Sequence, residues 1–319
     1  MKGSIRKRIQ FIDREENGLI EVKNLSKKYG PVPAVKDISF TVKEGYIYGF
    51  LGPNGAGKST TMNMICGCLA TTEGQISVNG HDIVDDAVEA KRCIGYLPEL
   101  PPLYTDMTPY EYLEFVGMAK GLRKEALYDE MEYVMDKTGI TEVADRLIKN
   151  LSKGYKQRVG IAQAIMGDPD IIILDEPTVG LDPIQIIEIR ELIRELGEEH
   201  TVILSSHILQ EIEAVCNRVI MISKGTIVAD DTLENLTKNE SLEDVFVRLA
   251  GESLDAGAAY AMEKLAAAEE KEKLSKKGKK KIVTDSTRGA AYYEEVYVDE
   301  DEEPVPEENS EIEAEEENE

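Results

Sequence analysis

The octapeptide Gly52-Pro53-Asn54-Gly55-Ala56-Gly57-Lys58-Ser59 lies between an apolar run, residues 47–51, and a helical pattern, residues 60–69. In this context it fits the pattern of a phosphate-binding loop. Its glycines let backbone N–H groups approach phosphate oxygens, and the start of the following helix adds partial positive charge. We expect Lys58 to reach the β- and γ-phosphates of a nucleotide, and the Ser59 hydroxyl to bind Mg²⁺. The predicted nucleotide-binding residues of this segment are Gly52, Pro53, Asn54, Gly55, Ala56, Gly57, Lys58, Ser59 and Thr60.

A second informative segment places two acidic residues at the end of an apolar run. Ile171-Ile172-Ile173-Leu174-Asp175-Glu176 predicts a buried strand with both acids at its carboxyl end. Ligands of open α/β sheets bind at that edge. Taken alone, two solvated acids at a strand end would be the simpler interpretation. Beside a phosphate-binding loop, Asp175 is expected to hold Mg²⁺, directly or through water, and Glu176 to be the general base for an attacking water.

Apolar runs alternate with helical patterns between residues 19 and 230, which predicts an α/β domain. Several runs are almost continuous Ile, Leu and Val, as in strands buried on both faces. We expect a P-loop nucleotidase fold with a mixed, mainly parallel sheet and antiparallel β elements near the N-terminus. The predicted strands are residues 19–22, 38–42, 47–51, 75–78, 171–174, 202–205, 219–222 and 226–229.

A wholly helical stretch, about residues 103–167, interrupts this alternation and is interpreted as a helical insertion. Thr108-Pro109-Tyr110-Glu111 predicts a capping box with proline at the first helical position. A second helix is predicted over residues 124–137, and residues 231–251 are predicted to close the domain as a helical element. Residues 1–18 form a polar extension, and residues 252–319 a charged tail that is expected to be disordered or, alternatively, to serve in docking or regulation.

The bulk composition excludes several classes of function. The net charge is −25, and residues 289–319 hold 15 acidic residues without Lys or Arg, which leaves −10 on the rest. This balance argues against nucleic-acid binding. No apolar run is long enough to cross a bilayer and none follows the basic first residues as in a signal peptide, so we expect a soluble chain. The four cysteines lack zinc-ribbon spacing and are predicted to be reduced core thiols: Cys66, Cys68, Cys93 and Cys216.

The segment Leu151-Ser152-Lys153-Gly154-Tyr155-Lys156-Gln157-Arg158 precedes an apolar helix and narrows the class of nucleotidase. Ser152 can cap that helix, and Gly154 lets the backbone approach a ligand, so the helix start can bind an anion. The segment resembles the signature motif of ABC ATPases, Leu-Ser-Gly-Gly-Gln. Two positions depart from it, because Lys153 replaces a glycine and Tyr155 replaces the glutamine. Lys153 is interpreted either as a positive charge for the γ-phosphate or as a solvated surface lysine.

Other segments between residues 19 and 251 resemble further motifs of this family, in the family's order. Residues 175–183 are similar to the joined catalytic strand and D-loop, and Ser205-Ser206-His207 to the segment with the switch histidine. Tyr29 resembles the aromatic residue that stacks on adenine. Alone, a Tyr or His at the positions of Tyr29 and His207 is more often a packing residue. Glu99 stands where the family commonly has glutamine, and its carboxylate could also bind Mg²⁺.

The resemblance implies a mechanism that needs two nucleotide-binding domains. They would close head-to-tail on two ATP molecules, as a homodimer or a heterodimer, so that Ser152 and Gly154 complete the partner's site. Glu176, His207 and Lys58 would form the catalytic set. The Mg²⁺ ligands would be Ser59, Asp175 and Glu99.

The same resemblance extends to a subclass. Residues 96–99, 151–158 and 241–246 look like segments of the ATP-binding subunits of type-two bacterial ABC exporters. This implies a separate transmembrane permease and a cytoplasmic position on the inner face of the cell membrane. A non-transport ABC ATPase is the alternative. Translation types of that kind usually carry two nucleotide domains and repair types long coiled coils, and this chain has neither.

Overall fold

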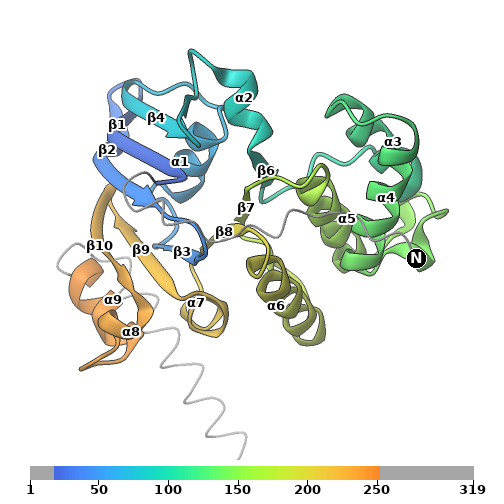
Figure 1. The fold of residues 1–319 in the computed structure, drawn as a ribbon. Coiled ribbons are helices and arrows are strands. Elements are labelled where there is room, and N and C mark those ends of the chain that lie inside the picture. The colour runs from blue at the N-terminus through green and yellow to red at the C-terminus, as the bar shows by residue number, and fades with distance from the viewer. Residues whose placement is uncertain (1–17, 252–319) are drawn as a thin grey trace, which may run out of the picture. The chain divides into compact units, whose positions relative to one another are not determined.

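The structure, a computed structural model, describes residues 18–251, and the predictions for residues 1–17 and 252–319 lie outside this range. The strands form two sheets (Figure 1). They are β1 (Ile20–Tyr29), β2 (Val32–Val42), β3 (Ile47–Leu51), β4 (Glu73–Val78), β5 (His81–Asp82), β6 (Ile94–Leu97), β7 (Ile171–Asp175), β8 (Thr201–Ser206), β9 (Arg218–Ser223) and β10 (Thr226–Thr232).

The larger sheet has the strand order β10-β9-β3-β8-β7-β6. All neighbours from β9 to β6 are parallel, and only β10 is antiparallel. The smaller sheet, β2-β1-β4-β5, is antiparallel throughout. The mixed, mainly parallel sheet with antiparallel elements near the N-terminus is therefore confirmed, although β6 was not predicted as a strand.

Side chains of the larger sheet alternate between two apolar cores. On β7, Ile172 and Leu174 pack in a core with helices, whereas Ile171 and Ile173 pack in a core shared with α1 and the smaller sheet. All four are fully buried. Burial on both faces explains why the run contains no polar residue until its carboxyl end, where the chain leaves the cores.

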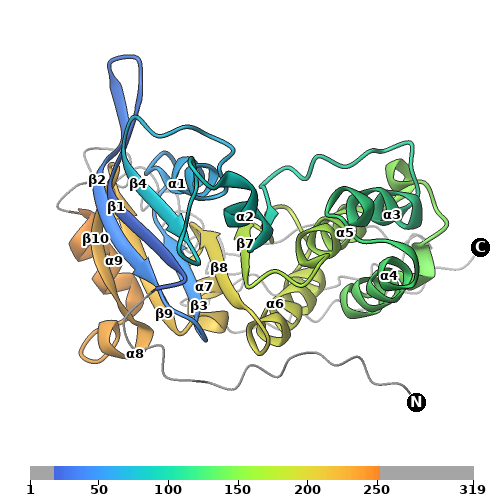
Figure 2. The same ribbon diagram turned by 45° about the horizontal axis from the view of Figure 1, so that its top comes forward.

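The helices cover the larger sheet and extend beyond it. α3, α4 and α5 lie together past the β6 edge, away from the smaller sheet, in both views (Figures 1 and 2). The helices are α1 (Lys58–Ile65), α2 (Ala87–Arg92), α3 (Pro109–Ala119), α4 (Lys124–Thr138), α5 (Lys153–Ile165), α6 (Pro183–Gly197), α7 (Leu209–Val215), α8 (Leu233–Leu236) and α9 (Leu242–Gly251), with 3-10 turns at Thr141–Val143 and Ile148–Asn150.

Local capping determines where α3 begins. The Glu111 amide donates to Thr108 Oγ1 at 3.2 Å, and the Thr108 amide donates to Glu111 Oε2 at 2.8 Å. This reciprocal pair is the predicted capping box, and it satisfies two amides that the helix itself leaves without partners.

Among residues 18–251, no helix combines the length and the apolar composition needed to cross a bilayer.

The cysteine prediction is partly wrong. Cys66 and Cys216 are buried as expected, and burial raises the pKa of both thiols. Cys93 is half-buried and Cys68 is exposed. Cys68 lies in the turn after α1 has ended, so its side chain leaves the core that Cys66 still reaches.

Candidate nucleotide-binding site

The loop between β3 and α1 runs so close to neighbouring backbone that two of its positions exclude any side chain. A Cβ added to Gly52 would lie 2.3 Å from the Ile222 carbonyl oxygen, and one added to Gly57 would lie 2.8 Å from that of Ala34. Gly57 also has φ of 109°, which L-residues rarely adopt. The glycines thus bend the chain back onto β2 and β9, which places the N-terminus of α1 at the carboxyl end of the larger sheet.

Lys58, the first residue of α1, is buried and points back along its own loop. Its ammonium donates to the Gly52 carbonyl oxygen at 2.8 Å and lies 3.4 Å from that of Pro53. It also lies 3.4 Å from Glu176 Oε1. The ammonium is therefore held at the mouth of the loop, where phosphate oxygens would meet the loop amides and the helix start.

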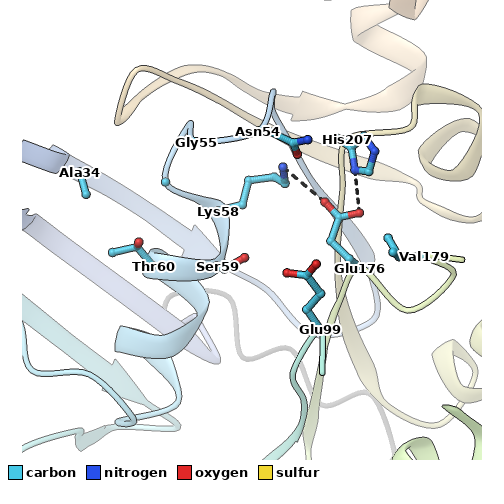
Figure 3. A pocket seen from close by; sticks show the side chains of 11 residues that line it. Ala34, Asn54, Gly55, Lys58, Ser59, Thr60, Glu99, Glu176, Val179 and His207 are labelled. Carbon is cyan, nitrogen blue, oxygen red and sulfur yellow. Dashed lines mark hydrogen bonds and ion pairs between the residues drawn. The ribbon is translucent and has the colours of Figure 1, made fainter. Parts of the chain in front are cut away.

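Glu176 contacts both Lys58, at the end of the phosphate-binding loop, and His207, which follows β8. Its Oε1 faces Lys58, and its Oε2 lies 2.9 Å from His207 Nδ1 (Figure 3). Glu176 is buried, whereas the His207 side chain is about a third exposed. His207 follows directly after β8, so neighbouring parallel strands β7 and β8 bring these two residues together at one sheet edge.

Asp175 has a different environment from its neighbour Glu176. It is fully buried at the end of β7 and accepts a hydrogen bond from the Ser205 hydroxyl on β8. The register pairs these two residues directly. Its negative charge also adds to the burial that raises the pKa of Tyr96 on β6. Asp175 is thus held at the end of β7 by a hydrogen bond within the sheet, directly before Glu176.

A pocket of about 460 Å³ gathers much of the predicted site, and its size suits a small-molecule ligand. Figure 3 shows Glu99 and Ser59 pointing into the same space as the Lys58–Glu176 pair. The lining residues are Ala34, Asn54, Gly55, Gly57, Lys58, Ser59, Thr60, Glu99, Glu176, Val179 and His207. Of the predicted residues, Gly52, Pro53, Ala56 and Asp175 belong to the same segments of the chain but do not line the pocket.

Three predicted residues lie apart from the pocket lining. Tyr29 ends β1, is half exposed, and has the Lys27 ammonium 5.5 Å from its ring centre. Ser152 is the N-cap of α5, with its hydroxyl accepting from the Tyr155 amide at 3.3 Å. Gly154 lies beside it, where a Cβ would meet the Gln185 side chain at 2.6 Å. The structure thus bears out the predicted cap, and Ser152 and Gly154 do not line the same chain's pocket.

Some residues around the site were not predicted. Ala34 on β2 and Val179 line the pocket, and neither carries chemistry that a motif could reveal. Glu211 on α7 is buried and bonds Thr178 and Ser206, which flank Glu176 and His207. The only sequence signal for Glu211 is an acid in the first turn of a helix after Ser205-Ser206-His207, which is an ordinary place for an acid.

Comparison with known proteins identifies the class that this site defines. The family model described as ABC transporter matches residues 35–179. The ABC transporter ATP-binding protein NatA of Bacillus subtilis is 40% identical over 216 residues, 67% of this chain and 88% of NatA. The bacitracin transport ATP-binding protein BcrA of Bacillus licheniformis is 40% identical over 222 residues, 69% of this chain and 72% of BcrA.

A solved structure supports the same class. A dimeric ATP-binding cassette in a post-hydrolysis state, bound to ADP and Pi, is 28% identical and aligns with a TM-score of 0.61 over 67% of this chain and 98% of that chain. The chain belongs to the ABC transporter family, as an ATP-binding subunit. Members of this family hydrolyse ATP, form dimers and work with membrane permeases.

Proposed function

We propose that this chain hydrolyses ATP at the pocket described above and couples the hydrolysis to transport through a separate membrane permease. The observation that carries the proposal is the position of Glu176, buried between the Lys58 ammonium and the His207 ring. A carboxylate held between a phosphate-directed cation and a histidine can accept a proton from water next to a bound triphosphate.

The nucleotide would lie along the phosphate-binding loop. The amides of the loop and of the α1 start would surround the phosphate oxygens, and Lys58 would turn from Gly52 and Glu176 toward them. Tyr29 would stack on adenine, since half of its side chain is free to do so. These roles follow from the family resemblance and from the placement of the loop, and the contacts of Gly52, Pro53 and Ala56 would be made by backbone.

Mg²⁺ fits the donor set near the triphosphate position. Ser59 and Glu99 line the pocket, and Asp175 lies at the adjoining end of β7, so the available atoms are all oxygens, as Mg²⁺ prefers. Among residues 18–251, no group of three or more His, Cys, Asp and Glu could hold a metal alone. This suits an ion that also needs phosphate and water ligands, and when bound it would neutralise charge on the phosphates.

The proposed reaction is in-line hydrolysis of the γ-phosphate. Glu176 accepts a proton from water as the water oxygen forms a bond to phosphorus. The bond from phosphorus to the β,γ-bridging oxygen breaks, and that oxygen keeps the electron pair in ADP. His207 would contact the γ-phosphate, and Lys58 would offset the charge on its oxygens.

Transport coupling would depend on a second nucleotide-binding domain. Ser152 and Gly154 are separate from the chain's own pocket, which is consistent with their completing the site of a partner, identical or different. ATP would favour closure because it contacts both halves, and loss of the γ-phosphate would remove that preference. The permease would hold the chain at the cytoplasmic face of the membrane. The relatives named for bacitracin transport and linearmycin resistance support a transport role.

The variant Glu176→Gln tests the proposal. It keeps the side-chain shape and removes the proton acceptor, so we expect ATP binding to persist, steady-state hydrolysis to be lost, and an ATP-bound dimer to accumulate in gel filtration. Glu198→Gln changes the exposed acid that caps the C-terminal end of α6 and serves as the control. Hydrolysis by Glu176→Gln at the parent rate would show that Glu176 is not the general base.

A further inference from the structure

A buried carboxylate on α7 connects the two loops that carry the proposed catalytic pair. Glu211 is 2% exposed. Its Oε1 accepts a hydrogen bond from Thr178 Oγ1, and its Oε2 accepts one from Ser206 Oγ at 2.7 Å. Thr178 lies two residues after Glu176, and Ser206 immediately precedes His207. Both oxygens of one side chain are therefore used to join the segment after β7 to the end of β8.

The arrangement is specific in its donors and acceptors. Ser206 Oγ also accepts from the Ile208 amide at 3.0 Å, so its hydroxyl hydrogen is directed to Glu211. The Thr178 carbonyl oxygen accepts from the Leu181 amide at 3.2 Å, which ties the same segment into a turn. Within residues 18–251, no Lys, Arg or His forms an ion pair with Glu211. The two hydroxyls thus supply the side-chain hydrogen bonds to the buried carboxylate, and the carboxylate in turn links the two segments that carry those hydroxyls.

We propose that Glu211 is a positioning residue, whose buried carboxylate holds Thr178 and Ser206 together and thereby keeps Glu176 and His207 at hydrogen-bonding distance. The inference rests on the proposed function, because it assigns Glu211 a role in the same hydrolysis. Glu211 touches neither the pocket nor the reacting atoms. It adds a side-chain link between two short segments beyond the point where the pairing of β7 with β8 ends at Asp175 and Ser205.

The substitution Glu211→Gln is the direct test, because it keeps the volume of the side chain and replaces one acceptor by an amide donor. The hydroxyl that meets this amide must then reverse its role, and Ser206 Oγ already accepts from Ile208. We expect kcat to fall by about tenfold or more, since small displacements of catalytic groups cost this much. ATP affinity should change little, whereas the unfolding midpoint should fall, because a buried donor would lack an acceptor. Glu213→Gln removes an exposed acid from the same helix and is the matched control.

A second readout does not depend on hydrolysis. The chain has three histidines, so a spectrum selectively labelled at the histidine ring contains three signals, and His207→Gln assigns the relevant one. We expect the His207 signal to shift in Glu211→Gln while the signal of His81, which lies on β5, stays in place. Neither signal should move in Glu213→Gln. This pattern would separate positioning from a general loss of structure.

The kcat of Glu211→Gln and its His207 signal are read together. Parent-like kcat together with an unmoved His207 signal in Glu211→Gln would overturn the inference. If Glu211→Gln does not fold, Thr178→Val removes one of the two hydroxyls while keeping the shape of the residue, and the same two readouts apply to it. If the parent itself shows no ATPase activity, the proposed function fails, and the His207 signal alone still decides whether Glu211 positions that loop.

Discussion

Gly57→Ala should destabilise the folded protein even when no nucleotide is present. Gly57 has φ of 109°, and left-handed backbone costs an L-residue about 1–2 kcal/mol. The new Cβ would also lie 2.8 Å from the Ala34 carbonyl oxygen, which is backbone of β2 and cannot swing away as a side chain could. Relieving such overpacking costs about 1–3 kcal/mol more. We therefore expect a loss of about 3 kcal/mol in the free energy of unfolding.

Gly55→Ala provides the matched control within the same loop. Gly55 has φ of 79°, and no atom lies within 4 Å of the position of its Cβ. Only the cost of left-handed backbone remains, so we expect the free energy of unfolding to fall by about 1–2 kcal/mol. The difference between the two variants isolates the contact with Ala34. Because that contact is between backbone segments, it should be present in the ligand-free protein.

Urea unfolding followed by far-UV circular dichroism measures both variants. The chain lacks tryptophan, so backbone signal is a better probe than fluorescence. Equal m-values in parent and variants would show that only stability has changed. Equal losses in Gly57→Ala and Gly55→Ala would refute the reasoning, because the close approach to β2 would then have no energetic consequence.

Two further predictions concern stability and thiol chemistry. Thr108→Ala should lower the free energy of unfolding by about 1 kcal/mol, because it removes the capping box of α3, and Thr108→Ser should restore most of the loss in the same urea titration. In native protein at pH 8, a disulfide-exchange reagent should label Cys68 rapidly and leave Cys66 and Cys216 unreacted until urea is added, because those two thiols are buried and burial raises their pKa values. Rapid native labelling of Cys216 would contradict the second prediction.

The larger sheet could be predicted because its strands are uniform. β7 and β8 are buried on both faces, so every position except Asp175 at the end of β7 is apolar or small, and the runs stand out from their surroundings. β6 was missed because it is only four residues long and contains Gly95. That glycine is needed because a Cβ there would lie 2.2 Å from the Ala164 carbonyl oxygen on α5, a close approach between distant segments that no local pattern reports.

Like the fold, the site contains residues that a continuous motif reveals and residues that only the folded chain brings together. The loop ending at Lys58 is one continuous motif, and its spacing alone indicates phosphate binding. Ala34 enters the pocket from β2, and Glu211 reaches the site from α7 by hydrogen bonds to two other segments. Their roles depend on which strands are neighbours, and β3 lies between β8 and β9 only in the folded sheet. A single sequence without that topology offers no means of finding them.

The backbone conformation at Glu176 places two adjacent acids, Asp175 and Glu176, in different surroundings. Asp175 still belongs to β7 and bonds Ser205 in the sheet, whereas Glu176 has φ of 49°, in the left-handed region. Such a conformation costs a non-glycine residue about 1–3 kcal/mol and persists only where neighbours enforce it. Here the Glu176 amide donates to the Ser205 carbonyl oxygen at 3.1 Å, and its own carbonyl oxygen accepts from the Val179 amide at 3.2 Å. Glycine would relieve the strain, but it has no carboxylate to place between Lys58 and His207. The left-handed turn at Glu176 gives the two consecutive acids different environments. It leaves Asp175 in the sheet and lets Glu176 face the pocket.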